Sequence, residues 1–340
     1  MLLWIDSFAS YGAIGAANPS GVLSRKYPTG NSSSIVIAAG RPGGLAIDFN
    51  TTGYTSGFGS PSLTAVDTVV LGFAAKFDVL PAAYTFCSLY DGANRNVKFV
   101  LLDTGEITVV NDDSTTLGTT SGAGITTGTW QYVEIKVKTH VSAGTIDIRV
   151  NEIPVLSATG KKTKCHSNSY SDVFGFGGID GTHFCLTDLY FLDTSGTANN
   201  NFLGNMQVTC VRPNSAGSST QFTPDSGSNY SRVNEAVCGD NSNYVEGSTP
   251  GHKDLYNYEA VPPANIYGVM ACTDCRETDA SPFSLVTVCK SGATESNDSA
   301  QSIGTTDFVT KVRVIENDPN TSAAWSKTNL DAAQFGVKVA

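Results

Sequence analysis

The segment from Gly128 to Leu156 alternates apolar and polar residues, and this alternation constrains the fold more than any other feature. In GTWQYVEIKVK, apolar residues recur at nearly every second position from Trp130 to Val137. After THVSAG, the segment TIDIRVNEIPVL resumes the alternation. A period of two is typical of half-buried strands. Consecutive hairpins with one apolar face need a second sheet to cover them, so the pattern predicts a β-sandwich whose cover we expect from residues 2–80.

Composition supports the same fold class. The chain has 34 glycines and only 15% charged residues, whereas helical proteins fill their exposed faces with Lys, Glu and Arg. The strongest helix candidate is the short NLDAAQF at residues 329–335. The run DTVVLGFAAKFDVL at residues 67–80 is continuously apolar, which predicts a central strand. We therefore expect an all-β chain.

The chain length and a change in local composition predict two domains. A length of 340 residues is enough for two hydrophobic cores. Residues 1–195 read as the first β-sandwich, and DTSGTANNNFLG is rich in turn-forming residues. We place a linker at residues 196–204 and a smaller β-sandwich or jelly roll at residues 205–340.

The net charge of the chain and its first residues argue against some classes of partner and location. A net charge of -10 argues against binding to a nucleic-acid backbone. Lys161, Lys162 and Lys164 form one basic cluster, which reads as a solvated loop. No apolar run is long enough to predict a membrane span, and Asp6 interrupts the first apolar residues, unlike a secretory signal. We expect synthesis in a reducing cytoplasm.

The eight cysteines do not form a recognisable framework. Cys272 and Cys275 make one C-x-x-C pair, but no second pair follows at the spacing of a structural zinc site. Recruitment of Cys289 and His252 in space is the alternative. Buried or half-exposed thiols are the default expectation, and we predict no resident metal from this motif.

Catalytic motifs are also missing. Glycoside hydrolases of sandwich fold carry paired carboxylates in E-x-D-x-x-E, and this string is absent. Glu134 and Asp147 are the nearest substitutes, and solvated edge charges are the simpler interpretation of both. No G-x-S-x-G elbow accompanies the four histidines, which lie in polar or turn-like segments: His140, His166, His183 and His252. We therefore expect a protein without enzymatic activity.

The order of the motifs resembles a known group of proteins. GTWQYVEIKVK, GTIDIRVNEIPVLSATG, a glycine-rich strand and LTDLYFLDTSGTANNNFLG are together similar to a concanavalin A-like (laminin G-like) sandwich. More specifically, the chain resembles predicted structural proteins of tailed bacteriophages. The matching positions are Trp4, Ile5, Asp6 and Phe8, then Phe202-Leu203-Gly204, Pro213, Thr223-Pro224, Gly227, Tyr230, Val233, Glu235 and Tyr244-Val245.

This resemblance implies a virion component assembled in the host cytoplasm. We expect a tail-associated fibre or adaptor subunit that contacts other virion proteins and copies of itself. A capsid decoration protein is the first alternative, and an adhesin that binds a host surface glycan is the second. We expect no cofactor, with calcium as the alternative.

Lectin-type sandwiches place oxygen ligands and aromatic residues in loops at the ends of strands, sometimes around calcium. Asp112 and Asp113 are the densest candidates for calcium, although plain turn residues would look the same. Asp188 resembles a structural position that ties down a neighbouring loop. The other candidates are Asp91, Asn94 and Asp180 for oxygen ligands, and Tyr84, Tyr90 and Tyr170 for stacking on a sugar ring.

Overall fold

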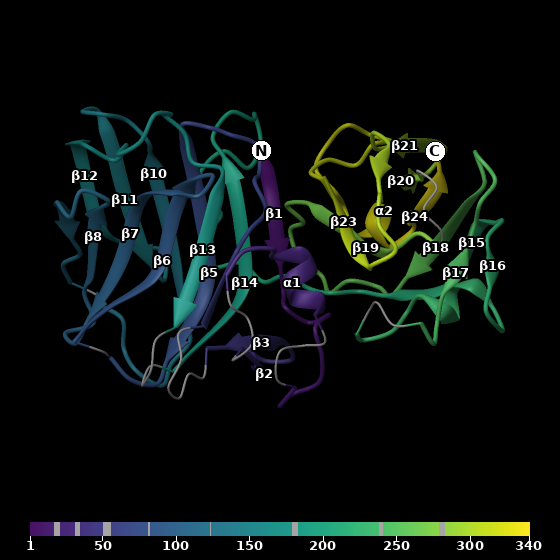
Figure 1. Cartoon of the computed structure of the whole chain (residues 1–340), viewed down its shortest axis with the longest axis horizontal. Coiled ribbons are helices and arrows are strands. Elements are labelled where there is room, and N and C mark those ends of the chain that lie inside the picture. Colours follow the sequence, from purple (N-terminus) through teal and green to yellow (C-terminus); the bar gives the residue numbers. More distant parts are fainter. Residues whose placement is uncertain are drawn as a thin grey trace. The chain divides into compact units, whose positions relative to one another are not determined.

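A computed structural model of the chain describes residues 1–16, 21–30, 35–49, 56–80, 82–122, 124–178, 183–237, 241–278 and 283–340. The described residues are almost entirely strands and turns, so the prediction of an all-β fold is confirmed (Figure 1). The chain divides into two compact units, Met1–Val208 (unit 1) and Thr209–Ala340 (unit 2). Residues 196–208, which include the predicted linker, belong to unit 1. None of the described helices is long and apolar enough to cross a membrane.

Unit 1 contains an eight-stranded antiparallel sheet in the order β12-β11-β10-β5-β14-β3-β2, with β1 also paired to β14. Its strands are β1 (Leu2–Asp6), β2 (Val36–Ala39), β3 (Leu45–Asp48), β5 (Thr68–Phe77), β10 (Gln131–Lys138), β11 (Gly144–Val150), β12 (Ile153–Lys161) and β14 (Phe184–Asp193). The predicted hairpin is confirmed, because Ile135 lies opposite Ile148 in register. The apolar run of β5 lies between β10 and β14, as a central strand should.

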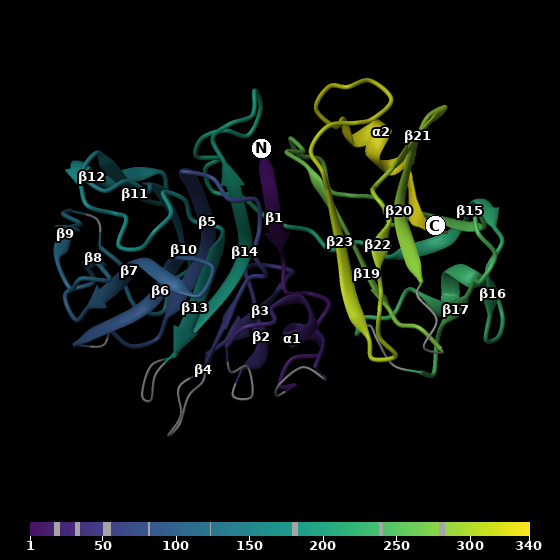
Figure 2. The same cartoon turned by 45° about the horizontal axis from the view of Figure 1, so that its top comes forward.

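A six-stranded sheet forms the second layer of unit 1, in the order β4-β13-β6-β7-β8-β9 (Figure 2). Its strands are β4 (Ser56–Gly59), β6 (Ala83–Asp91), β7 (Asn94–Leu102), β8 (Ile107–Asn111), β9 (Thr116–Thr119) and β13 (Val173–Gly178). The expectation that residues 2–80 cover the hairpins is therefore wrong. Most strands of that segment join the sheet of the hairpins, and the cover comes mainly from residues 83–119 and 173–178.

The core between the two layers is rich in aromatic rings. Phe184 stacks on Phe49, with ring centroids 4.3 Å apart, and on Phe77 at 5.0 Å. Phe73 meets Phe176 of the opposite sheet edge-to-face at 4.9 Å. All five rings are buried. Burial of each such ring contributes roughly 1.5–3 kcal/mol, so this aromatic layer contributes substantially to the stability of unit 1.

A short helix, α1 (Val22–Lys26), was not predicted from the sequence. It places the ammonium of Lys26 against the carboxylate of Asp6, with a separation of 2.8 Å. Tyr11 and Tyr27 donate their hydroxyls to the same oxygen, at 2.5 and 2.8 Å. This buried network holds the first strand to the helix.

Unit 2 is built on a six-stranded sheet in the order β15-β18-β24-β20-β21, with β22 also paired to β20. These strands are β15 (Pro213–Thr220), β18 (Lys253–Tyr258), β20 (Ser284–Ser291), β21 (Thr294–Asn297), β22 (Gln301–Ser302) and β24 (Gln334–Val339). Two strand pairs complete the unit: β16 (Thr223–Pro224) with β17 (Val245–Glu246), and β19 (Val269–Cys275) with β23 (Val309–Ile315). The 3-10 turn η1 covers Asn229–Arg232.

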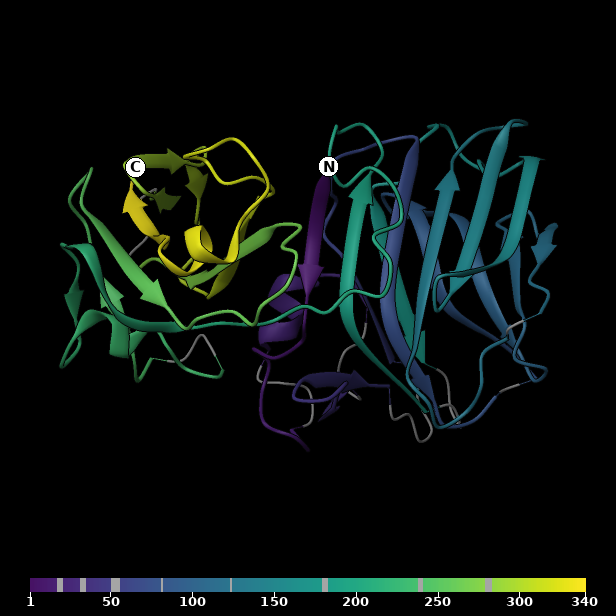
Figure 3. The same ribbon diagram turned by 180° about the vertical axis from the view of Figure 1, so that it is seen from behind.

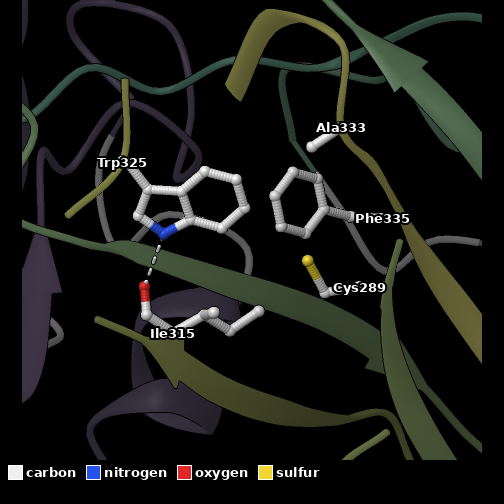
Figure 4. Close-up of a cluster of buried hydrophobic side chains, with 5 residues drawn as sticks. All are labelled: Cys289, Ile315, Trp325, Ala333 and Phe335. Atoms are coloured by element: carbon white, nitrogen blue, oxygen red, sulfur yellow. Dashed lines mark hydrogen bonds between the residues drawn. The ribbon is translucent and has the colours of Figure 1, made fainter. Parts of the chain in front are cut away.

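The core of unit 2 is smaller and divided. Figure 4 shows one cluster, in which Trp325 lies beside Phe335 and donates its indole N–H to the carbonyl of Ile315 at 3.1 Å. This contact packs the β19–β23 pair against the main sheet. Of the helix candidate at residues 329–335, for which a loop was the equal alternative, only residues 329–331 are helical, at the end of α2 (Lys327–Asp331), and β24 begins at Gln334. Ser326 caps it by accepting from the backbone N–H of Asn329 at 3.1 Å.

Candidate functional site

Antiparallel pairing brings several polar side chains to one end of the unit 1 sandwich. The end of β6, the start of β7 and the end of β8 meet at this end, beside the loop 162–172 that leads into β13. We call the side chains gathered there the apical cluster: Asp91, Arg95, Asp112, His166, Asn168 and Tyr170. Only Asp91, Asp112 and Tyr170 of this cluster were candidates from the sequence.

One half of the apical cluster is centred on Asp112. The Nε–H of Arg95 donates to the Oδ1 atom of Asp112 at 3.0 Å, and the Nη2 atom of the same guanidinium lies 2.9 Å from that oxygen in an ion pair. The Nε2 atom of His166 lies 3.2 Å from the second oxygen and 3.1 Å from the carbonyl of Arg95. The side chains of Arg95, Asp112 and His166 are about a third exposed, at 35%, 29% and 32%. This hydrogen-bonded set is therefore held in place and still reachable from solvent.

The other half joins Asn168, Asp91 and Tyr170. The amide of Asn168 donates to Asp91 at 3.1 Å and to the hydroxyl of Tyr170 at 3.0 Å. Partial desolvation and the nearby Asp91 carboxylate raise the pKa of Tyr170 above its ordinary value. The phenol therefore keeps its proton at neutral pH. Because the Tyr170 ring is half-exposed and ends in a hydroxyl, it suits both stacking on a ligand and hydrogen bonding to it.

Asn96 fixes the loop that carries these residues. Its side chain is fully buried, donates to the carbonyl of Tyr170 at 3.0 Å and accepts from the N–H of Cys165 at 3.3 Å. Asp172 closes the loop by accepting from the N–H of Gly92 at 2.7 Å. The loop is thus held by buried hydrogen bonds, which position the apical side chains in advance of any ligand.

The predicted calcium candidates are separated by their ion pairs. Asp112 faces Arg95, whereas Asp113 pairs with Lys162 at 2.5 Å. The hydrogen bond from Lys162 lowers the pKa of Asp113 below its ordinary value. A calcium ion would have to displace these cations, and its binding stays a prediction. Among the described residues, no three His, Cys, Asp or Glu side chains are grouped as a metal site requires.

The remaining oxygen candidates are dispersed. Asp188 accepts from the N–H of Val208 at 2.9 Å and pairs with Arg41 at 3.2 Å, so its predicted role in tying down a neighbouring segment is confirmed. Asn94 is exposed at the first position of β7, and Asp180 lies outside the described residues.

The tyrosine candidates also differ in position. Tyr84 is only 2% exposed and belongs to the core, so it cannot stack on a sugar. Tyr90 is half-buried and its ring lies over Gly175 of β13, because a Cβ atom there would be 3.2 Å from the ring. Its strand-mate Asp91 belongs to the apical cluster. Of the three tyrosines, Tyr170 is therefore the one joined to polar partners at the exposed end.

The nearest substitutes for a catalytic carboxylate pair do not face each other. Glu134 lies opposite Arg149, and Asp147 lies opposite Lys136. Asp147 accepts from the hydroxyl of Ser157 at 2.7 Å. Glu134 has no exposed surface, so its interpretation as a solvated edge charge is wrong.

The C-x-x-C pair lies on β19, where residues three apart point to opposite faces. Burial raises the pKa of the Cys275 thiol to about 12, which disfavours the thiolate that redox chemistry and zinc need. Cys289 lies in the core of unit 2. Cys238 lies outside the described residues.

No protein-family model matches the chain, and no curated protein matches it. Solved structures similar to it include the alginate lyase Aly36B, with 13% identity, a TM-score of 0.38 and coverage of 56% of this chain and 96% of that one. The carbohydrate-binding module CBM66 from Bacillus subtilis is 8% identical, with a TM-score of 0.31, and the match covers 47% and 92% of the two chains. A sialidase is 9% identical with a TM-score of 0.34, and the match covers 47% of this chain but only 17% of the sialidase.

These likenesses concern the sandwich fold, and they correct one expectation. The expectation of a protein without enzymatic activity, which rested on missing motifs, is contradicted, because the similar structures include a sialidase and an alginate lyase beside a binding module. The missing sequence motifs argue against two catalytic designs, not against enzymes as a class. None of the three is a virion protein by its name, and the phage resemblance stays a prediction.

The sequence could not identify Arg95, His166 and Asn168 as one site. His166 lies 54 positions from Asp112 and 71 from Arg95 in the chain. The sequence signal for this site is the run HSNSYSD at residues 166–172. It is dense in hydrogen-bonding side chains around one aromatic residue, as a binding loop would be.

Proposed function

We propose that unit 1 binds a glycan at the apical cluster. The observation that carries the proposal is the joining of Arg95–Asp112–His166 and Asp91–Asn168–Tyr170 into two hydrogen-bonded sets, which connect the loop 162–172 to the ends of β6, β7 and β8. Sugars need fixed donors and acceptors for their hydroxyls and an aromatic face for their C–H groups. Both kinds of group occur here within one loop.

Charge favours a hydroxyl-rich ligand over a strongly anionic one. Arg95 is neutralised by Asp112, and Asp91 contributes a further carboxylate. The site therefore offers many donors and acceptors with little net positive charge, whereas a phosphate backbone needs a basic surface. The loss of one good hydrogen bond costs a sugar about 0.5–1.5 kcal/mol of affinity, so several must act together.

Glycan-array screening of the full chain, followed by calorimetric titration, tests this function. We expect Tyr170→Ala and Asn168→Ala each to weaken binding at least about tenfold, since each removes a contact worth about 1.4 kcal/mol. The matched control is Tyr244→Ala in unit 2, a tyrosine that is 43% exposed and outside the cluster. Binding that survives both apical substitutions would refute the site, and the absence of any glycan ligand would refute the function.

The same titration samples decide whether binding is accompanied by cleavage. Each glycan that binds is incubated with the protein and its chain length is measured by mass spectrometry. Shortened chains that disappear in Asn168→Ala would make the apical cluster an active site. Unchanged chains would leave it a recognition site.

We further propose that the chain displays this site on a virus particle. The order of motifs from Trp4 to Val245 supports this location, as do the partners that it implies, namely other virion proteins and further copies of the chain. Quantitative mass spectrometry of purified particles tests it. A few to some tens of copies would favour a tail-associated fibre or adaptor, hundreds would favour capsid decoration, and absence from the particle would reject the location.

A further inference from the structure

Residues 201–208, which we call the strap, follow β14 and lie across the outer face of the eight-stranded sheet. Figure 3 shows this sheet from its outer side, with the teal chain after β14 running in front of it. The strap lies in unit 1 and ends at the last residue of that unit. It forms no strand with the sheet beneath it.

The centre of the strap is bound by side chains of two strands. The backbone N–H of Gly204 donates to the Oε1 atom of Glu134 at 2.9 Å, and that of Leu203 donates to the hydroxyl of Tyr190 at 3.2 Å. Tyr190 in turn donates to the Oε1 atom of Glu134. The carboxylate of β10 and the phenol of β14 thus hold two successive amides of the strap.

Further contacts hold both ends of the strap. Arg41 donates to the carbonyl of Met206 at 2.7 Å, and Asp188 accepts from the N–H of Val208 at 2.9 Å. Toward its start, the guanidinium of Arg149 lies 4.3 Å from the ring centre of Phe202. The sheet therefore binds the strap as it would bind an extended peptide, through the main chain and one aromatic residue.

The closed arrangement leaves one polar atom unsatisfied. Glu134 has no exposed surface and Tyr190 is 2% exposed. The Oε2 atom of Glu134 is buried and has no hydrogen-bond partner among the described residues. A buried acceptor without a partner is unfavourable, and exposure to water removes that penalty. Opening of the strap would allow water to donate to this oxygen.

We propose that the strap is a latch, which opens without unfolding the sandwich and exposes the Glu134–Tyr190 pair to solvent. The strap itself is half-exposed, with Phe202, Leu203 and Gly204 only partly covered. It lacks the ladder of backbone hydrogen bonds that holds β14 between its neighbours. Local openings of such weakly packed segments require less free energy than global unfolding. This device is independent of the apical cluster.

Hydrogen exchange of the full chain, followed by mass spectrometry, tests the latch. At low denaturant concentration, we expect the amides of Leu203, Gly204 and Val208 to exchange at least about tenfold faster than those in the middle of β14. Nitration of Tyr190 by tetranitromethane should rise in parallel with strap exchange. Equal protection of the strap and β14, or unreactive Tyr190 under conditions where the strap exchanges, would overturn the proposal.

A matched pair of glycine substitutions strengthens the test. Gly204 has φ +85°, and a Cβ atom there would lie 2.6 Å from the Oε1 atom of Glu152. Gly204→Ala should therefore open the strap and speed its exchange at least about tenfold, because an L side chain is strained at this φ. Gly251 of unit 2 has φ +84° with no atom near its Cβ position, so Gly251→Ala carries the same backbone strain elsewhere. Faster strap exchange in both variants, or in neither, would contradict the latch.

Discussion

Each unit buries an aspartate, and the two units satisfy these carboxylates in different ways. In unit 1, Asp6 is 6% exposed and is paired with the buried ammonium of Lys26 and two tyrosine hydroxyls. In unit 2, Asp254 has no exposed surface and accepts from neutral donors: the N–H of Phe222 at 2.8 Å, Asn229 at 2.5 Å and Tyr256 at 2.9 Å.

The difference concerns what each carboxylate holds together. Asp6 joins β1 to α1 within the first 26 residues and keeps a second charge buried beside it. Asp254 joins β18 to the segment around Phe222 and η1, and the groups that donate to it are neutral. An ion pair is costly to break from one side, because the remaining charge stays buried, whereas a set of neutral donors loses only hydrogen bonds.

The largest predicted effect is therefore in unit 1. Asp6→Ala should destabilise this unit by about 3–5 kcal/mol, because it leaves the Lys26 ammonium buried without its carboxylate. Lys26→Met should cost less, since Asp6 keeps its tyrosine donors and the N–H of Phe8. Urea unfolding followed by circular dichroism measures both. If Lys26→Met proves as damaging as Asp6→Ala, the charge pair is not the reason for the difference between the units.

A smaller effect is expected for the neutral network of unit 2. Asp254→Asn should destabilise unit 2 by about 1–3 kcal/mol, because the amide keeps one acceptor oxygen and replaces the other with a donor that faces the existing donors. The calorimetric transition of unit 1 should stay in place, which makes that transition the internal control. A loss above the value for Asp6→Ala would reverse the predicted order of the two carboxylates.

The smallest effect concerns an exposed aspartate of unit 2 and appears only in acid. Hydrogen bonds from Arg232, at 2.6 Å to each oxygen, lower the pKa of Asp225 from 3.8 to about 2. Because the folded pKa is depressed, the stabilisation is complete above pH 3.8 and disappears as the pH falls through about 2.

Thermal melting of unit 2 between pH 5 and pH 2 measures this dependence, at values chosen to span the shift in Asp225. Asp225→Asn should flatten the profile, since the substituted side chain does not titrate. An unchanged profile would assign the acid sensitivity of unit 2 to other carboxylates. In that case the difference between the two units would be supported only by the results for Asp6 and Asp254.

Local patterns in the sequence were sufficient to predict much of the fold. The alternation from Trp130 to Val150 predicted the two strands β10 and β11 of a hairpin, and the apolar run at 67–80 predicted the central strand β5. The terminal segment QFGVKVA is β24, with Phe335 and Val337 buried on one face. Side-chain periodicity reports which face of a strand is buried, and that face is a local property.

The same patterns could not predict which strands share a sheet. Residues 2–80 have the alternation of a covering layer, yet most of their strands extend the sheet that contains the hairpins. Pairing is decided by contacts between segments far apart in the chain, which periodicity does not encode. For the same reason the sequence did not reveal that the strap covers Glu134, since that contact spans 70 positions.

The sequence by itself determined the all-β class, the main hairpins and several residues of the apical cluster as single candidates. Only the tertiary structure decided that Arg95, Asp112 and His166 form one set, and that Glu134 is buried rather than solvated. The physical reason is that a strand's own residues set its exposed and buried faces, whereas the neighbours of each polar side chain depend on how the whole sheet closes.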